Sequence, residues 1–112
     1  SEMCIRDSSY AYLADTNYSA KAARLVAGVD LLYHEATYAD AERRIARERG
    51  HSTALQAAKA AVAARAGRLV IGHYSARYRD EGVLVEEART CFPETFPAVE
   101  GETFTIEKRR EP

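Results

Sequence analysis

The chain has 112 residues, of which 46% are hydrophobic and 29% are charged, and its formal net charge is −1. This length allows one domain with a hydrophobic core. The balanced charge provides no overall basic field for nucleic-acid binding, although local arginines can still contact a nucleic acid. No apolar run approaches the roughly 18 residues of a membrane span, and no signal peptide is recognisable. We therefore expect a cytoplasmic protein without a membrane partner, with Cys4 and Cys91 as free thiols.

In chain order, hydrophobic runs alternate with helical patterns. They predict a strand at residues 10–14, a helix at 19–27 ended by Gly28, a strand at 29–33 and a helix at 38–49 ended by Gly50. An alanine-rich helix follows, from its cap at Ser52 or Thr53 to residue 66, and is ended by Gly67. The remaining predicted elements are a strand at 69–71, a helix at 81–91 capped by Asp80, a loop marked by Pro93 and Pro97, and a strand at 103–107. Short continuous apolar runs between helices are typical of strands buried on both faces. The sequence therefore predicts an α/β layer.

The two ends of the chain do not fit this alternation. Residues 1–8 match no pattern in the rest of the chain and look like a translated adapter or cloning junction, so we exclude them from the predicted fold. The predicted domain covers residues 9–107 and begins abruptly in a strand, which suggests that something upstream is missing. Residues 108–112 are expected to be a frayed tail.

Four polar islands contain all three histidines and every residue that we select for chemistry. They are Ala14-Asp15-Thr16, His34-Glu35-Ala36-Thr37, His51-Ser52-Thr53 and His73-Tyr74-Ser75-Ala76-Arg77-Tyr78. No two histidines lie within one helical turn, so the pattern favours loops at strand ends that converge after folding. The islands predict half of the site of a metal-dependent hydrolase.

Asp15 and His73 are the candidate metal ligands. A carboxylate at the end of a strand can bridge two cations, although a turn or N-cap aspartate is the more frequent role. His73 follows a predicted buried strand and Gly72, and imidazole is a favoured zinc ligand, although a histidine at the rim bonded to a backbone carbonyl is an equally good interpretation.

Glu35, His51, Ser75 and Arg77 are the candidates for proton transfer and phosphate binding. Glu35 can orient a histidine, and His51 precedes a helix, so the two can form a general-acid pair; the alternative for His51 is an exposed residue before the helix. Arginine offers a planar fork for phosphate oxygens, and Ser75 can add a hydroxyl. The alternative is a surface arginine paired with Asp80 or Glu81.

Taken together and in this order, the islands resemble the carboxyl-terminal half of ribonuclease Z, the tRNA 3′-end-processing member of the metallo-β-lactamase superfamily. The resemblance covers about Tyr10 to Glu107 and implies half of an αββα sandwich. It implies that Asp15 bridges two zinc ions and that His73 is a terminal ligand of one of them. Glu35 and His51 resemble the proton-transfer pair, with His51 donating to the leaving 3′ oxygen of precursor tRNA. Ser75 and Arg77 correspond to phosphate contacts, and His34 receives no metal.

The chain departs from this family in one large respect. The His-x-His-x-Asp-His cluster that supplies most of the metal ligands is absent, as is a further ligand histidine before Asp15. We therefore expect a fragment that is inactive alone, that belongs to a homodimeric enzyme when full length, and that self-associates through uncovered strands. The alternatives are another phosphodiesterase of the superfamily, or a non-catalytic α/β interaction or dimerisation module.

Overall fold

The computed structural model describes residues 3–6, 10–14 and 27–98. They form a five-stranded sheet with the order β1-β2-β3-β4-β5, in which β1 and β2 are antiparallel and all other pairs are parallel. The strands are β1 (Met3–Arg6), β2 (Tyr10–Ala14), β3 (Leu31–Glu35), β4 (Arg68–Gly72) and β5 (Thr95–Pro97). The predicted α/β layer is confirmed, and the structure adds that the sheet is parallel from β2 to β5.

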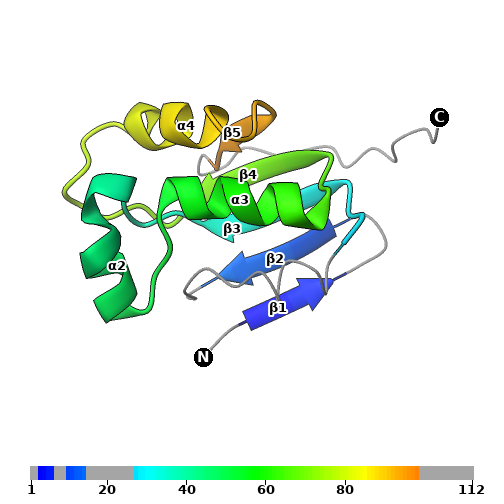
Figure 1. The fold of residues 1–112 in the computed structure, drawn as a ribbon, viewed down its shortest axis with the longest axis horizontal. Coiled ribbons are helices and arrows are strands. Elements are labelled where there is room, and N and C mark those ends of the chain that lie inside the picture. Colours follow the sequence, from blue (N-terminus) through cyan, green and yellow to red (C-terminus); the bar gives the residue numbers. More distant parts are fainter. Residues whose placement is uncertain (1–2, 7–9, 15–26, 99–112) are drawn as a thin grey trace.

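The helical elements of the described part connect the parallel strands. Between β3 and β4 the chain forms a 3-10 helix η1 (Asp40–Glu42) and two α-helices, α2 (Arg43–Arg49) and α3 (Ala54–Ala64), and α4 (Gly82–Arg89) connects β4 to β5. In Figure 1, α3 lies across the sheet at β3 and β4, and α4 lies alongside it near β5; α4 contacts both α3 and β5. No helix in the described ranges is long and apolar enough to cross a membrane.

Small side chains allow α3 to lie close to the sheet. Its buried residues are all alanines, and they pack against leucine and isoleucine side chains of β3 and β4. The buried residues of α4 complete the same core. Burial of apolar surface is the main stabilising term, at about 25 cal/mol per Å². The core positions the carboxyl ends of β3 and β4 and the start of α3, where the polar islands lie.

The ends of α3 show where local sequence signals succeeded and where they failed. Thr53, one of the two predicted caps, is the N-cap, and the structure shows that it forms a capping box with Gln56. The carboxyl end was predicted wrongly: the helix ends at Ala64, and Arg65, not Gly67, takes the left-handed cap conformation with φ 53°. Gly67 instead donates its N–H to the carbonyl of Val29 at 3.0 Å, which places it at the entry to β4.

Other element boundaries also differ from the predictions. Residues 38 and 39 are not helical, because Tyr38 forms a bridge with Thr53, and the predicted single helix is η1 followed by α2, ended by Gly50 as predicted. The segment between Pro93 and Pro97 contains β5, which was not predicted; a proline is acceptable there because β5 is the last strand of the sheet among the described residues. The strand predicted at 29–33 occurs two residues later, at Leu31–Glu35.

Several predictions lie at or beyond the limits of the described residues. The helix at 19–27, except its last residue, the strand at 103–107 and the tail at 108–112 fall outside them. Met3–Arg6, which we excluded from the predicted fold, forms β1 and pairs with β2. The interpretation of residues 1–8 as a junction stays a prediction.

Candidate functional site

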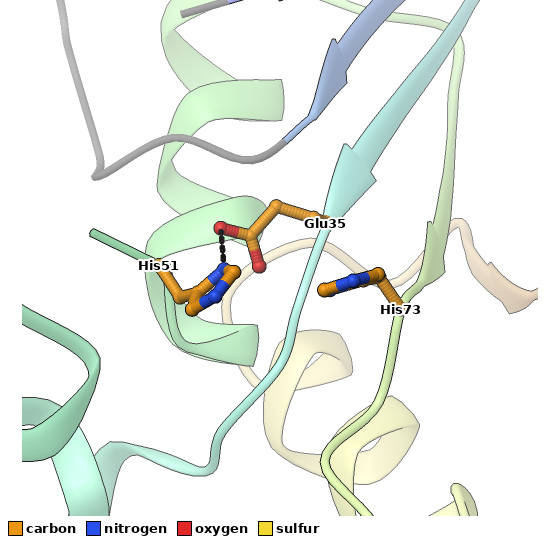
Figure 2. A group of neighbouring side chains, drawn as sticks. All are labelled: Glu35, His51 and His73. Atoms are coloured by element: carbon orange, nitrogen blue, oxygen red, sulfur yellow. Dashed lines mark ion pairs between the residues drawn. The ribbon is translucent and has the colours of Figure 1, made fainter. Parts of the chain in front are cut away.

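The parallel pairing of β3 and β4 brings two of the islands together. Glu35, the last residue of β3, lies opposite Gly72, the last residue of β4, and His73 follows directly. His51 comes from the turn between α2 and α3. Figure 2 shows Glu35 between the two histidines, all three from different segments of the chain. The predicted convergence at the carboxyl ends of strands is therefore present among the described residues.

Glu35 is completely buried and is held by three hydrogen bonds. Its Oε1 accepts from the backbone N–H of Ser52 at 2.6 Å, and its Oε2 accepts from the N–H of Thr37 at 3.1 Å and from the Thr37 hydroxyl at 2.7 Å. A buried carboxylate is costly unless such donors compensate it. These donors fix the direction of the carboxylate and leave it beside His51.

His51 lies close to both Glu35 and His73. Its Nδ1 is 3.5 Å from Oε1 of Glu35, and its ring centroid is 5.3 Å from that of His73. Within the described part of the chain, this buried Nδ1 makes no hydrogen bond. Protonation of His51 would turn the contact with Glu35 into an ion pair. The predicted Glu35–His51 pair is therefore present as a close contact.

His73 has an unusual backbone conformation, with φ 62° in the left-handed region. A non-glycine residue rarely takes this conformation, and it persists where surrounding contacts enforce it. Next to it, a side chain at Gly72 would collide with the hydroxyl of Tyr33 unless Tyr33 moved. The hydroxyl of Thr37 lies 3.0 Å from Nδ1 of His73. The strained backbone and this contact together direct the imidazole toward His51.

His34 does not join the other two histidines. It is buried, and its Nδ1 lies 2.8 Å from the carbonyl oxygen of Glu35. Burial lowers its pKa below the usual value, and the carbonyl and the charge of Glu35 offset this only in part. A neutral, buried imidazole bonded to the backbone suits a role in the core.

Ser75 and Arg77 lie at the rim, next to the cluster. The N–H of Ser75 donates to the carbonyl of Thr37 at 2.9 Å, and its hydroxyl accepts from the N–H of Arg77 at 3.3 Å. The exposed guanidinium of Arg77 pairs with Glu42 at 3.5 Å and lies 5.5 Å from the ring centroid of Tyr38. Its acidic partner is thus Glu42, and not Asp80 or Glu81 as in the alternative interpretation. Asp15 lies outside the described residues.

The three clustered side chains have the donor atoms that zinc prefers. One ligand atom from each of Glu35, His51 and His73 lies within 4.8 Å of the others, and a carboxylate with two imidazoles is a known zinc donor set. The unbonded Nδ1 of His51 is a further feature that a ligand or proton partner would satisfy. The residues therefore fit a divalent metal. Glu35 already accepts three hydrogen bonds, which suits it better to orienting His51 than to holding an ion.

Sequence reasoning gave no role to two residues that organise the site. Thr37 belongs to the island of His34 and Glu35, and its position two residues after Glu35 could have indicated a contact between the two side chains. Glu87 accepts hydrogen bonds from the backbone N–H groups of Asp40 and Leu55. These contacts span 47 and 32 residues, so no local pattern could have revealed them.

The chain is similar in sequence to known proteins. Ribonuclease Z of Bacteroides thetaiotaomicron is 50% identical over 97 residues, which are 87% of this chain and 31% of that protein. Ribonuclease Z of Parabacteroides distasonis is 48% identical over 97 residues, again 87% of this chain and 32% of that protein. The chain thus spans about a third of the length of these homologues.

The fold is also similar to solved structures. The crystal structure of the short form of human tRNase Z matches with a TM-score of 0.68 and 33% identity, over 88% of this chain and 33% of that one. A metallo-β-lactamase fold protein from Bacillus subtilis matches with a TM-score of 0.73 and 26% identity, over 86% of this chain and 39% of that one. The family model described as "Beta-lactamase superfamily domain" matches residues 3–74, more than half of the sequence. The chain therefore belongs to the β-lactamase superfamily.

Proposed function

We propose that this chain is part of an endoribonuclease that removes 3′ trailers from precursor tRNA by metal-dependent phosphodiester hydrolysis. The observation that carries the proposal is the convergence of Glu35, His51 and His73 in a chain about 50% identical to ribonuclease Z. We further propose a cytoplasmic homodimer of the full-length protein, as the family resemblance implies.

In this function, Glu35 and His51 carry out the proton transfer. The carboxylate beside Nδ1 stabilises the protonated imidazole, and the opposite nitrogen, Nε2, then carries a proton that it can donate to the leaving 3′ oxygen. The hydrogen bonds from Ser52 and Thr37 keep Glu35 in place during this exchange. Burial of Glu35 strengthens its interaction with the charged ring, because the surroundings screen charge less than water does.

His73 and Asp15 are the proposed zinc ligands of this segment. When bound, the two ions expected in the complete site would activate a water and neutralise charge on the phosphate. Two ligands are too few for two ions, so we propose that the 112 residues alone do not cleave RNA.

Ser75 and Arg77 are the proposed phosphate contacts. The fork of Arg77 is exposed and can exchange Glu42 for a phosphate, since an exposed ion pair contributes only about 0 to 1 kcal/mol. The stacking on Tyr38 keeps the guanidinium near the rim while its partner changes.

The test joins residues 10–112 to the amino-terminal part of the Bacteroides thetaiotaomicron homologue and measures 3′ cleavage of a precursor tRNA. The chimera is compared with Asp15→Ala, His51→Ala and the control Lys59→Ala, which changes an exposed residue of α3. We expect cleavage by the chimera and by the control. His51→Ala should lose at least about 100-fold, the usual size of a general-acid contribution, and Asp15→Ala should lose activity because a proposed metal ligand is removed. A folded, zinc-loaded chimera that leaves precursor tRNA intact would overturn the proposed function.

A further inference from the structure

Thr37 stands between the proton-transfer pair and the proposed metal ligand. Its hydroxyl donates to Oε2 of Glu35 at 2.7 Å and lies 3.0 Å from Nδ1 of His73. Thr37 is 6% exposed, so its contact with Glu35 is sheltered from water, whereas His73 on its other side is exposed. The side chains of His51, Glu35, Thr37 and His73 thus form one continuous series of polar contacts.

The chemistry of a hydroxyl decides the direction of the second contact. A threonine hydroxyl has a single hydrogen, and a carboxylate has none to give, so that hydrogen goes to Glu35. The oxygen of Thr37 can then act only as an acceptor toward His73, and Nδ1 of His73 must carry the hydrogen. A neutral imidazole with its hydrogen on Nδ1 has its lone pair on Nε2. Thr37 therefore selects the Nδ1–H form of His73.

The backbone around Thr37 keeps its hydroxyl in this place. Its N–H donates to Oε2 of Glu35 and to the carbonyl of Ser52, both at 3.1 Å. Its own carbonyl accepts from Ser75 at 2.9 Å. Threonine is also β-branched and has few χ1 choices. With the backbone fixed on both sides, the hydroxyl cannot turn away from Glu35 and His73 without losing both contacts.

We propose that Thr37 is a positioning residue that holds His73 with its hydrogen on Nδ1 and its metal-binding lone pair on Nε2, a role that rests on the function proposed above. A hydrogen-bond partner on the second nitrogen fixes the orientation of a ligating histidine and raises its basicity. Because Thr37 draws its own orientation from Glu35, the same carboxylate orients His51 directly and His73 through one hydroxyl. The orientations of the proton-transfer histidine and of the proposed metal ligand therefore both depend on the buried carboxylate of Glu35.

The test is imidazole ¹⁵N NMR on the 112-residue chain without metal, at about pH 8, where an ordinary imidazole is neutral. Thr37→Val removes the hydroxyl and keeps the shape, and Thr37→Ser is the matched control that keeps the hydroxyl. We expect the hydrogen of His73 on Nδ1 in the original chain and in Thr37→Ser, and a shift toward Nε2 in Thr37→Val. If packing and not the hydroxyl decided the position of the hydrogen, Thr37→Ser, which loses the methyl group, would not behave like the original chain. Amide spectra verify that each variant is folded.

Zinc titration of the same three proteins by calorimetry gives a second measure. We expect Thr37→Val to bind zinc about 10- to 100-fold more weakly, the usual cost of losing such a partner, and Thr37→Ser to bind within about 3-fold. A hydrogen on Nε2 of His73 in the unchanged chain would overturn the inference even if Thr37→Val does not fold. Equal zinc affinity of folded Thr37→Val would do the same. An inactive tRNA chimera whose His73 keeps its hydrogen on Nδ1 would overturn the proposed function alone.

Discussion

The carboxylate of Glu87 on α4 joins the starts of two helices on either side of the candidate site. Its Oε2 accepts from the N–H of Asp40 at 3.0 Å and from the N–H of Leu55 at 3.1 Å, and its Oε1 also accepts from Asp40 at 2.9 Å. Asp40 opens η1, shortly after the Glu35–Thr37 segment, and Leu55 lies in the first turn of α3, shortly after His51. One side chain therefore holds together the two segments that carry the Glu35–His51 contact.

Substitution of Glu87 by methionine should destabilise the fold measurably. The change keeps the length of the side chain but removes the acceptor of two backbone N–H groups, and each such loss costs about 1 to 3 kcal/mol. Glu87 is half-buried, so water can replace part of the loss, and we expect the free energy of unfolding to fall by about 2 to 3 kcal/mol. Glu87→Gln keeps one oxygen that can serve both donors, as Oε2 does now. We expect it to cost about 1 kcal/mol, mainly for the lost charge at the start of α3.

Urea unfolding followed by circular dichroism measures these differences on the chain itself. The control is Glu86→Met, which makes the same chemical change on an exposed neighbour in α4. Hydrogen exchange should also show faster exchange at the amides of Asp40 and Leu55 in Glu87→Met. If Glu87→Met unfolds at the same urea concentration as Glu86→Met, the contacts of Glu87 contribute nothing, and the reasoning is refuted.

Three further predictions concern titration and phosphate binding. Burial lowers the pKa of His34, so the unfolded chain takes up a proton first as the pH falls below about 6.5, and stability should decrease there by up to about 1.4 kcal/mol per pH unit. His34→Asn should weaken this dependence in urea unfolding; an unchanged slope would contradict it. Burial raises the pKa of Tyr74 to about 12, so stability should fall as the pH rises from about 10 toward that value, where the unfolded phenol ionises first. Tyr74→Phe should remove that contribution and the absorbance change near pH 12, and a phenol that titrates near pH 10 would refute it. In the tRNA chimera, Arg77→Ala should lower kcat/KM about 10-fold, which corresponds to about 1.4 kcal/mol, and a loss of equal size in the exposed control Arg79→Ala would show that Arg77 has no special role.

The sequence alone was sufficient for several features with a local signal, although the helix stop expected at Gly67 lies at Arg65. The N-cap of α3 and the stop at Gly50 follow from neighbouring residues, because a cap satisfies N–H and carbonyl groups within one turn. The alternation of buried strands with helices likewise predicted the α/β layer, and strands joined through helices pair in parallel in the structure. Parallel strands share one carboxyl edge, so the meeting of Glu35 and His73 could also be predicted.

Only the tertiary structure decided how the site is held together. The contact of Thr37 with His73 joins residues 36 positions apart, and those of Glu87 cross from α4 to η1 and α3. Which acid pairs with Arg77, and which side chain fills the space at Gly72, also depend on how the helices and strands pack. Propensity and periodicity act over a few residues, whereas hydrogen bonds between distant segments form only after the hydrophobic core has fixed their distance.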